Sequence, residues 1–375
     1  MKAIALVPGT TNVSLVDVPE PHIAAPDEVK IKIWQVGICG TDREQAEGGR
    51  ADAPEGKTQL IIGHEMFGEV VEIGSEVKRV QKGDYGVFIV RRGCGKCKAC
   101  MNGRSDMCFT GDYTERGIKG ADGFQAEYVV DKEPYLVKVP GEMKEIGVLT
   151  EPMSVASKAI DEAMIIQQAR LSDFDESLNW LKGKRALVAG IGPIGLMAAF
   201  ALRLRGAEVI GMDIVDKNSY RPAILERIGG KYVDGRKINT LNFDEECGDA
   251  DFVFEATGIA KLQIELIDTL ARNGIYVATG IPAGERPLTI SAGAIMKQLV
   301  LKNQIIVGSV NASLKHYQMA VEDLHKSFQN WPDAIKAVIT EKIPATDFYT
   351  ALHRHSQDEI KVVVEWDKGI NKPGK

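Results

Sequence analysis

The sequence has no excess of basic residues and no long run of apolar residues, and each absence excludes a class of function. Lys and Arg number 46 against 52 Asp and Glu, which gives a formal net charge of −6. Nucleic-acid binding draws on clustered Lys and Arg, so this balance argues against a nucleic-acid partner. No segment approaches the roughly 18 uninterrupted apolar residues that a membrane helix requires, so we expect no membrane partner.

The sequence also has no internal repeat, no low-complexity linker and no pattern typical of a secretion signal. Its first ten residues, MKAIALVPGT, are typical of a short strand that meets a Pro-Gly turn. These features predict a cytoplasmic protein. In a reducing compartment, clustered cysteines are more often metal ligands than disulfides, which bears on the six cysteines of this chain.

The length of 375 residues exceeds what one hydrophobic core usually organises, so two domains are expected. Residues 1–150 contain many short alternating strands broken by Gly and Pro, which favours an antiparallel, barrel-like domain. The middle of the chain instead resembles a doubly wound parallel sheet, in which both faces are covered and strands are continuously apolar. Such runs predict strands at 250–258, 274–282 and 303–311.

Helical spacing of apolar residues predicts a helix over 259–273, between the first two of these strands. A second helix is expected over 313–328. The last apolar run, EIKVVVEWD at 359–367, is predicted to be a strand that returns to the first domain.

Four of the six cysteines lie within fifteen positions, in the pattern C-x2-C-x2-C-x7-C. Four thiolates around one zinc ion make a closed tetrahedral site that stabilises a fold and leaves no place for a substrate. An iron–sulfur cluster and reduced, metal-free thiols are the alternatives, although Phe109 stands where a bacterial ferredoxin pattern would place Pro. The pattern predicts a structural zinc site at Cys94, Cys97, Cys100 and Cys108.

A second set of possible metal ligands is dispersed in the chain. Cys39 ends an alternating strand in WQVGICGTD, His64 and Glu65 follow another strand in IIGHEMFGEVVEIG, and Glu151 begins a helix in VLTEPMSVASKAI. Each residue alone has an ordinary structural interpretation, such as a small buried thiol or a helix start. Together, one thiolate, one imidazole and one or two carboxylates are typical of a catalytic zinc site with one open position.

A glycine-rich turn in the middle of the chain predicts nucleotide binding. The segment KRALVAGIGPIGLMAAFALRLRG reads as strand, turn and helix, and the strand AEVIGMD follows it. In such turns the glycines permit a tight bend, approach of a pyrophosphate and close packing of helix on strand. A Rossmann fold without bound nucleotide is the alternative. The residues expected to bind the cofactor here are Gly190, Gly192, Pro193, Ile194 and Gly195.

Asp213 ends the second strand of this unit, 18 residues after Gly195, and completes the expected cofactor site. Its carboxylate can accept hydrogen bonds from the adenosine ribose and would repel a 2′-phosphate. NAD is therefore expected to be preferred over NADP. Lys217 and Arg221 follow closely and can soften that preference, so NADP remains possible.

Several segments together resemble the zinc-containing medium-chain alcohol dehydrogenases, and within them the archaeal-type glucose dehydrogenases. They are GICGTD, GHEMFGEVVEIG, RRGCGKC, EPMSV, GIGPIG, ERGIKGADGF and VGSVNAS, which span nearly the whole chain. The resemblance implies an α/β fold. A GroES-like, mostly antiparallel β catalytic domain is expected over 1–155 and 312–375, and a Rossmann dinucleotide-binding domain with a doubly wound parallel sheet over 156–311. It also implies a homodimer or homotetramer, for which an exposed apolar edge at 304–310 is a plausible contact.

The resemblance also implies roles for single residues. Cys39 and His64 would hold the catalytic zinc, and Glu65 and Glu151 would complete its ligands directly or through water. Glu151 would also handle substrate or proton, and Thr41 would contact the reacting oxygen.

Two further residues resemble positions that contact sugar hydroxyls in this family, namely Glu115 and Asn311. A surface carboxylate and a turn asparagine are the alternative interpretations. Val90 and Leu301 depart from polar residues found in some glucose dehydrogenases, which puts the preferred sugar in doubt.

Three functions remain open at this point. The first is a zinc-dependent oxidoreductase that transfers hydride from C1 of an aldose, most plausibly D-glucose, to NAD(P)+ and yields the 1,5-lactone. The second is a polyol, secondary-alcohol or threonine-type dehydrogenase on the same scaffold. The third is a nucleotide-binding scaffold without catalysis, against which the joint presence of Cys39, His64, Glu65 and Glu151 argues.

Overall fold

The structure is a computed structural model that describes residues 1–171, 179–282, 284, 287–356 and 358–366. The chain divides into two compact units, which are described separately. The first comprises Met1–Ser154, Asn311–His325 and Ile339–Lys375, and the second comprises Val155–Val310 and Lys326–Val338. The expected division places Val155 and Asn311 on the other side of the boundary, and it assigns 326–338 to the first domain. In the structure this stretch includes α10 (Pro332–Lys336), which packs against α5 (Tyr220–Arg227) of the second unit.

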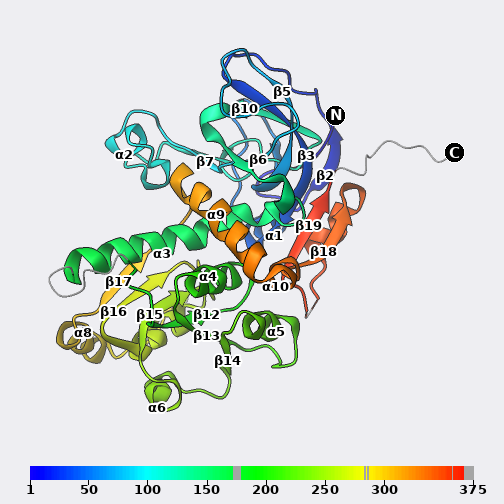
Figure 1. Cartoon of the computed structure of the whole chain (residues 1–375). Helices are drawn as coiled ribbons and strands as arrows, with labels where there is room; N and C mark the ends of the chain where they lie inside the picture. The colour runs from blue at the N-terminus through cyan, green and yellow to red at the C-terminus, as the bar shows by residue number, and fades with distance from the viewer. Residues whose placement is uncertain (172–178, 283, 285–286, 357, 367–375) are drawn as a thin grey trace. The chain divides into compact units, whose positions relative to one another are not determined.

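The first unit is built mainly from short antiparallel strands (Figure 1). Its helices are α1 (Gly40–Ala46), α2 (Lys98–Met101) and α11 (Phe348–His353), while α3 (Thr150–Leu171) and α9 (Leu314–Asn330) belong partly to each unit. The strands are β1 (Lys2–Leu6), β2 (Val13–Asp17), β3 (Glu28–Ile38), β4 (Leu60–Ile61), β5 (Glu65–Ile73), β6 (Tyr85–Phe88), β7 (Arg91–Arg92), β8 (Thr114–Arg116), β9 (Gly120–Ala121), β10 (Tyr128–Lys132), β11 (Leu136–Val139), β18 (Ile339–Pro344) and β19 (Lys361–Glu365).

The long strand β3 organises this unit, because β5, β10 and β19 all pair with it in antiparallel fashion. In the register, Gly37 of β3 lies opposite Glu65 of β5, and Ile38 lies opposite Val362 of β19. The predicted return of the last strand to the first domain is thus confirmed for the described residues, and residue 367 of that prediction lies outside them. Three strand ends therefore meet beside Cys39.

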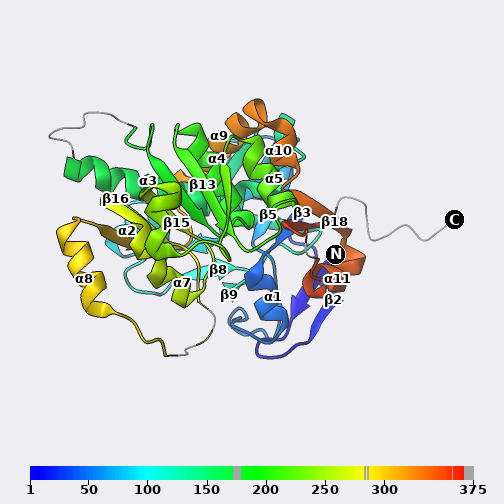
Figure 2. The same ribbon diagram turned by 90° about the horizontal axis from the view of Figure 1, so that it is seen from below.

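The second unit is built around a parallel sheet with the strand order β14-β13-β12-β15-β16-β17 (Figure 1), of which Figure 2 labels β13, β15 and β16 from another side. Helix α4 packs against the central strands β12, β13 and β15. Eight of its residues are buried, and each large apolar side chain among them contributes roughly 1.5–3 kcal/mol by leaving water. The strands are β12 (Arg185–Ala189), β13 (Glu208–Asp213), β14 (Lys231–Asp234), β15 (Ala250–Glu255), β16 (Leu270–Ala278) and β17 (Ile305–Gly308); the helices are α4 (Pro193–Leu204), α5, α6 (Phe243–Cys247), α7 (Ala260–Glu265), α8 (Ala292–Leu301) and α10.

The helix predicted over 259–273 is shorter in the structure. Helix α7 ends at Glu265, a 3-10 turn follows over Leu266–Thr269, and β16 begins at Leu270. Leu270 is fully buried and pairs with Ala250 of β15, so packing in the sheet core overrides the local helical pattern. None of the helices in the described residues is both long and apolar enough to cross a membrane.

Candidate active site

Cys39, His64 and Glu65 converge in the first unit at the end of β3. The Cys39 Sγ lies 3.1 Å from the His64 Nε2, and one possible ligand atom of each of the three residues lies within 4.8 Å of the others. Gly37 is needed here, because a Cβ at this position would collide with the Glu65 carboxylate. The structure thus assembles three of the four predicted ligands of a catalytic zinc.

Charge in this cluster favours a cation. Burial by itself would lower the pKa of His64, but the charges of Cys39 and Asp42 outweigh burial and raise it well above its usual value. The same negative groups would attract a metal ion, and thiolate, imidazole and carboxylate are the donors that zinc takes. The residues therefore fit a zinc ion.

Two buried charged residues hold these ligands, and neither was predicted from the sequence. Asp42 accepts a hydrogen bond from the Cys39 backbone N–H at 2.8 Å, and its Oδ1 lies 3.5 Å from the His64 Nδ1. Lys361 is only 1% exposed, and its Nζ lies 2.7 and 2.6 Å from the two carboxylate oxygens of Glu65 and also donates to the Ile38 carbonyl. The signal for Asp42 was its position three residues after the helix-capping Cys39.

Glu151 lies in the first turn of α3 and stands outside the three-residue ligand group. Burial raises the pKa of its carboxyl to about 7; His64 opposes the rise and Glu65 adds to it. A carboxyl that titrates near neutral pH can both take and release a proton. Thr41, in the first turn of α1, donates its backbone N–H to the Cys39 Sγ at 3.2 Å.

Glu115 and Asn311 lie together although 196 residues separate them in the chain. The Asn311 Nδ2 donates to the Glu115 Oε1 at 2.7 Å, and the Asn311 backbone has a positive φ of 61°. Arg91, which sequence reasoning missed, also donates to this oxygen, from Nη2 at 2.8 Å and Nε at 3.1 Å. The Glu115 side chain is 13% exposed, so it is not an ordinary surface carboxylate.

The four clustered cysteines form a second possible metal site, in which all four Sγ atoms lie within 4.8 Å of one another. The backbone N–H groups of Cys97 and Cys100 point at the sulfurs of Cys94 and Cys97, at 3.4 and 3.5 Å. Such donors stabilise thiolates, and four thiolates fit the closed tetrahedral site of a structural zinc.

The predicted glycine-rich turn borders a cavity of about 280 Å³ in the second unit. Gly190 has a positive φ of 83°, and a Cβ on Gly195 would collide with the Gly190 carbonyl. Gly192 precedes α4, whose first residues are Pro193 and Ile194. Gly190 and Gly192 line this cavity together with Asp213, Arg221 and Thr257.

Asp213 is held in place within this cavity. Its Oδ2 accepts the Ile191 N–H at 3.0 Å and lies 3.6 Å from the Arg221 Nη1. Arg221 and Asp213 therefore place a positive and a negative charge side by side in the wall of this cavity.

A buried carboxylate that the sequence analysis overlooked supports the same cavity. Glu255 is fully buried at the end of β15, and its Oε1 accepts hydrogen bonds from the Thr257 N–H and hydroxyl, both at 2.6 Å. The same oxygen also accepts from the Gly258 N–H at 2.9 Å, and the Oε2 accepts from the Gln263 amide at 2.7 Å. Glu255 thus fixes the loop that faces the glycine-rich turn.

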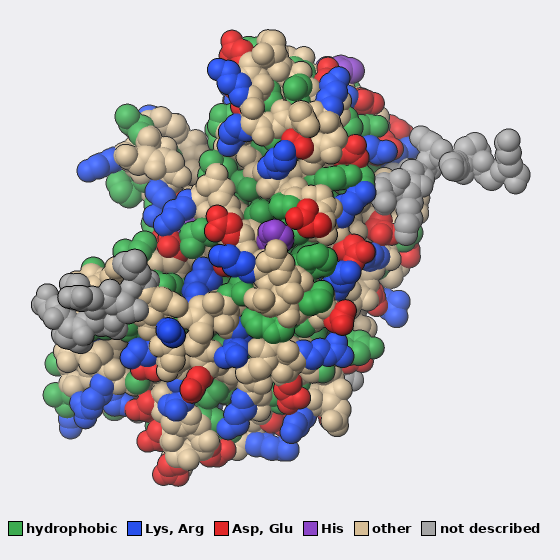
Figure 3. Space-filling view, viewed as in Figure 1, with side chains coloured by type: hydrophobic (Ala, Val, Ile, Leu, Met, Phe, Trp, Pro, Cys, Tyr) green, Lys and Arg blue, Asp and Glu red, His purple; other side chains and the backbone are tan. Residues whose placement is uncertain are grey.

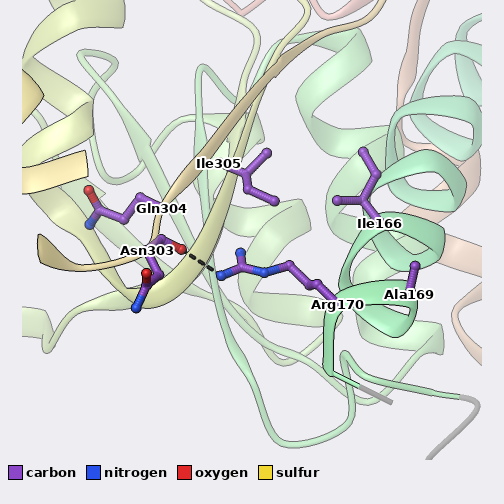
Figure 4. Close-up of a pocket in the computed structure, with 6 residues that line it drawn as sticks. All are labelled: Ile166, Ala169, Arg170, Asn303, Gln304 and Ile305. Atoms are coloured by element: carbon purple, nitrogen blue, oxygen red, sulfur yellow. Dashed lines mark hydrogen bonds between the residues drawn. The ribbon is translucent and has the colours of Figure 1, made fainter. Parts of the chain in front are cut away.

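A larger hollow of about 550 Å³ lies elsewhere in the second unit, between α3 and the start of β17 (Figure 4). Arg170 reaches across it and donates to the Asn303 carbonyl at 2.7 Å, while Ile166 and Ile305 form apolar parts of its wall. Its residues include no member of the glycine-rich turn and none of the metal-binding groups.

On the face that Figure 3 shows, basic and acidic side chains are interspersed, so charge of one sign does not dominate there.

Comparison with known proteins identifies relatives of both parts of the chain. Residues 144–366 match the family model described as glucose dehydrogenase C-terminus, and residues 25–141 match the alcohol dehydrogenase GroES-like domain. Glucose 1-dehydrogenase 2 of Vulcanisaeta moutnovskia is 40% identical over 369 residues, covering 97% of this chain and 99% of that protein. Glucose 1-dehydrogenase of Methanocella arvoryzae is 35% identical, again over 97% of this chain and 99% of that protein.

Solved structures agree with this likeness. Haloferax mediterranei glucose dehydrogenase in complex with NADP, zinc and gluconolactone superposes with a TM-score of 0.86 at 31% identity, covering 97% of this chain and 99% of that one. The 2R,3R-butanediol dehydrogenase of Bacillus subtilis gives a TM-score of 0.77 at 25% identity, with the same two coverages. The predicted fold class, a GroES-like domain plus a Rossmann-type parallel sheet, is confirmed.

Proposed function

Because this chain belongs to the glucose dehydrogenase family of the zinc-containing medium-chain alcohol dehydrogenases, we propose that it oxidises D-glucose at C1 with NAD(P)+. The product would be the 1,5-lactone, and the Haloferax relative was solved with gluconolactone. The observation that carries the proposal is the group formed by Cys39, His64 and Glu65. A nucleotide-binding scaffold without catalysis would have no use for three converging metal donors.

The side chains around this group divide the chemical work. Zinc held by Cys39, His64 and Glu65 would supply the Lewis acid that stabilises negative charge on the C1 oxygen as hydride leaves for the nucleotide. Asp42 and Lys361 hold His64 and Glu65 in place. Glu151, with its pKa near 7, accepts the hydroxyl proton.

Substrate orientation falls to the residues near the reacting oxygen. Thr41 contacts the oxygen at C1 or passes on its proton. Glu115 and Asn311 bind sugar hydroxyls, and their mutual hydrogen bond at 2.7 Å supports a shared role. In this scheme the first unit is the catalytic domain and the second unit binds the nucleotide.

We further propose that NAD is preferred and NADP accepted. Asp213 supports the preference, and the Arg221 guanidinium 3.6 Å from it supports the tolerance. A structural zinc is assigned to the four cysteines, which also fits a cytoplasmic, reducing location.

A homodimer or homotetramer is proposed as well. The edge strand β17 and the segment after it expose Ile306 at 43% and Val310 at 51%, which suits a contact with a second copy. Light scattering coupled to gel filtration measures the oligomeric state.

The proposal is tested by initial rates of NAD+ and NADP+ reduction with D-glucose, D-galactose, D-xylose, sorbitol, L-threonine and 2,3-butanediol. Rapid oxidation of D-glucose that is lost in Cys39→Ala is expected, with Cys247→Ala as the matched control because that thiol lies outside both metal groups. Turnover of open-chain alcohols alone would refute the sugar assignment. An alcohol dehydrogenase activity of this kind is the competing hypothesis, because butanediol dehydrogenase has a similar fold.

A further inference from the structure

Arg91 occupies a position between two parts of the first unit that the proposed function uses separately. It lies on β7, is 6% exposed, and faces Glu115 of β8 in the antiparallel register. Its Nε and Nη2 both donate to the Glu115 Oε1, at 3.1 and 2.8 Å. Its Nη1 donates to the carbonyl of Asp106 at 2.9 Å.

Asp106 belongs to the four-cysteine lobe, which we define as residues 94–108. It lies in the 3-10 helix Ser105–Met107, directly before Cys108, and is itself buried. The neighbouring Ser105 hydroxyl donates back to the Arg91 carbonyl at 3.5 Å. One guanidinium therefore connects the position of this lobe to the position of Glu115.

The hydrogen bonds on Glu115 are unevenly shared between its two oxygens. Oε1 accepts from Arg91 and from the Asn311 Nδ2, whereas Oε2 accepts no hydrogen bond from the described residues. A carboxylate clamped through one oxygen presents the other in a fixed direction, as a substrate hydroxyl requires. The guanidinium carbon of Arg91 lies 3.9 Å from the centroid of the Tyr113 ring, which covers one face of the guanidinium.

We propose that Arg91 is a positioning residue that ties the four-cysteine lobe to Glu115 and Asn311 and thereby sets the discrimination among aldoses. This inference rests on the proposed function, since it assigns a purpose to the Oε2 of Glu115. Arginine is suited to the task because its planar fork donates to the Glu115 carboxylate and to the Asp106 carbonyl in a fixed geometry, whereas an ammonium group is a point charge on a flexible stem.

Arg92 provides a matched control in the next position. Its guanidinium pairs with Asp131 at 2.7 Å and stacks on Tyr135, and no hydrogen bond joins it to Glu115. Arg91→Lys and Arg92→Lys are thus the same chemical change on adjacent residues whose side chains are 7% and 13% exposed, and only the first is expected to loosen Glu115.

Arg91→Lys should raise KM for D-glucose by about tenfold, the loss expected for hydrogen bonds to a charged group, and narrow the preference for D-glucose over its epimers. The KM for the nucleotide and kcat should change less than about twofold, as should every parameter of Arg92→Lys. A positioning role requires that Arg91→Lys adds nothing to KM in a Glu115→Gln background. The inference would be overturned if Arg91→Lys and Arg92→Lys raised KM for D-glucose equally. It would also be overturned if the double variant of Arg91→Lys and Glu115→Gln raised KM by the product of the two single effects.

A second measurement is independent of turnover. Amide hydrogen exchange should become faster in Arg91→Lys, and not in Arg92→Lys, over both 98–108 and 113–116. If the wild-type chain oxidises no aldose, the proposed function fails. The exchange pattern then tests by itself whether Arg91 ties the four-cysteine lobe to Glu115. Unchanged exchange in either segment would then refute it.

Discussion

Replacing Lys361 by Met is expected to destabilise the first unit strongly, because it leaves the Glu65 carboxylate buried without its counter-charge. Both side chains are about fully buried, at 1% and 2% exposure, so solvent does not screen the pair. Breaking such a pair by removing one partner costs roughly 3–5 kcal/mol. For a domain of this size, about 2–4 °C per kcal/mol gives a fall in Tm of roughly 6–20 °C.

A bound zinc ion should reduce the loss of stability in Lys361→Met, which would show that the loss comes from the uncompensated Glu65 charge. A zinc ion beside Glu65 would itself compensate the carboxylate, so the fall in Tm should be larger after chelation than with zinc added. Lys361→Arg keeps the charge and should lose little.

Scanning calorimetry of both forms is the assay, with Lys342→Met on the neighbouring strand β18 as control, since Lys342 is exposed. A Tm of chelated Lys361→Met within about 2 °C of the wild type would refute the reasoning.

Three further predictions follow from the site. Burial raises the pKa of Glu151 to about 7, and the ionised form accepts the proton, so kcat/KM should fall as the pH drops below about 7. A bound zinc ion that favours the carboxylate form would move this fall to a lower pH. Glu151→Gln should remove the acidic limb from the pH–rate profile. Glu255→Gln should raise the nucleotide KM by about tenfold with the sugar KM unchanged, as steady-state kinetics would reveal. Asp213→Asn should shift the ratio of kcat/KM values toward NADP+, and Arg221→Met should shift it toward NAD+; a ratio that moves in neither variant would contradict the assignment of this pair.

Most of the candidate metal-binding groups could be predicted from the sequence because their residues lie in short local patterns. The C-x2-C-x2-C spacing, and the positions of Cys39 and His64 at strand ends, can be recognised from residues that are adjacent in the sequence. The same holds for the glycine-rich turn, whose glycines are required by backbone geometry within a few residues.

The residues that hold these ligands were missed for a physical reason. Lys361 reaches Glu65 only because β19 pairs with β3, and Arg91 reaches Glu115 only through the register of β7 and β8. Such contacts depend on tertiary pairing, which no local spacing encodes. The same cause explains the helix predicted through Leu270, where burial in the sheet decided the outcome.

The pairing of β19 with β3 also has a consequence for biosynthesis. A ribosome releases Cys39, His64 and Glu65 first, and Lys361 emerges 296 residues after Glu65. Until then, the Glu65 carboxylate of the nascent first unit lacks the Lys361 ammonium, and β3 lacks the strand β19 along Gln35–Ile38. Early metal capture would stabilise this intermediate, so zinc supply during translation should govern how much of the newly made chain folds rather than aggregates.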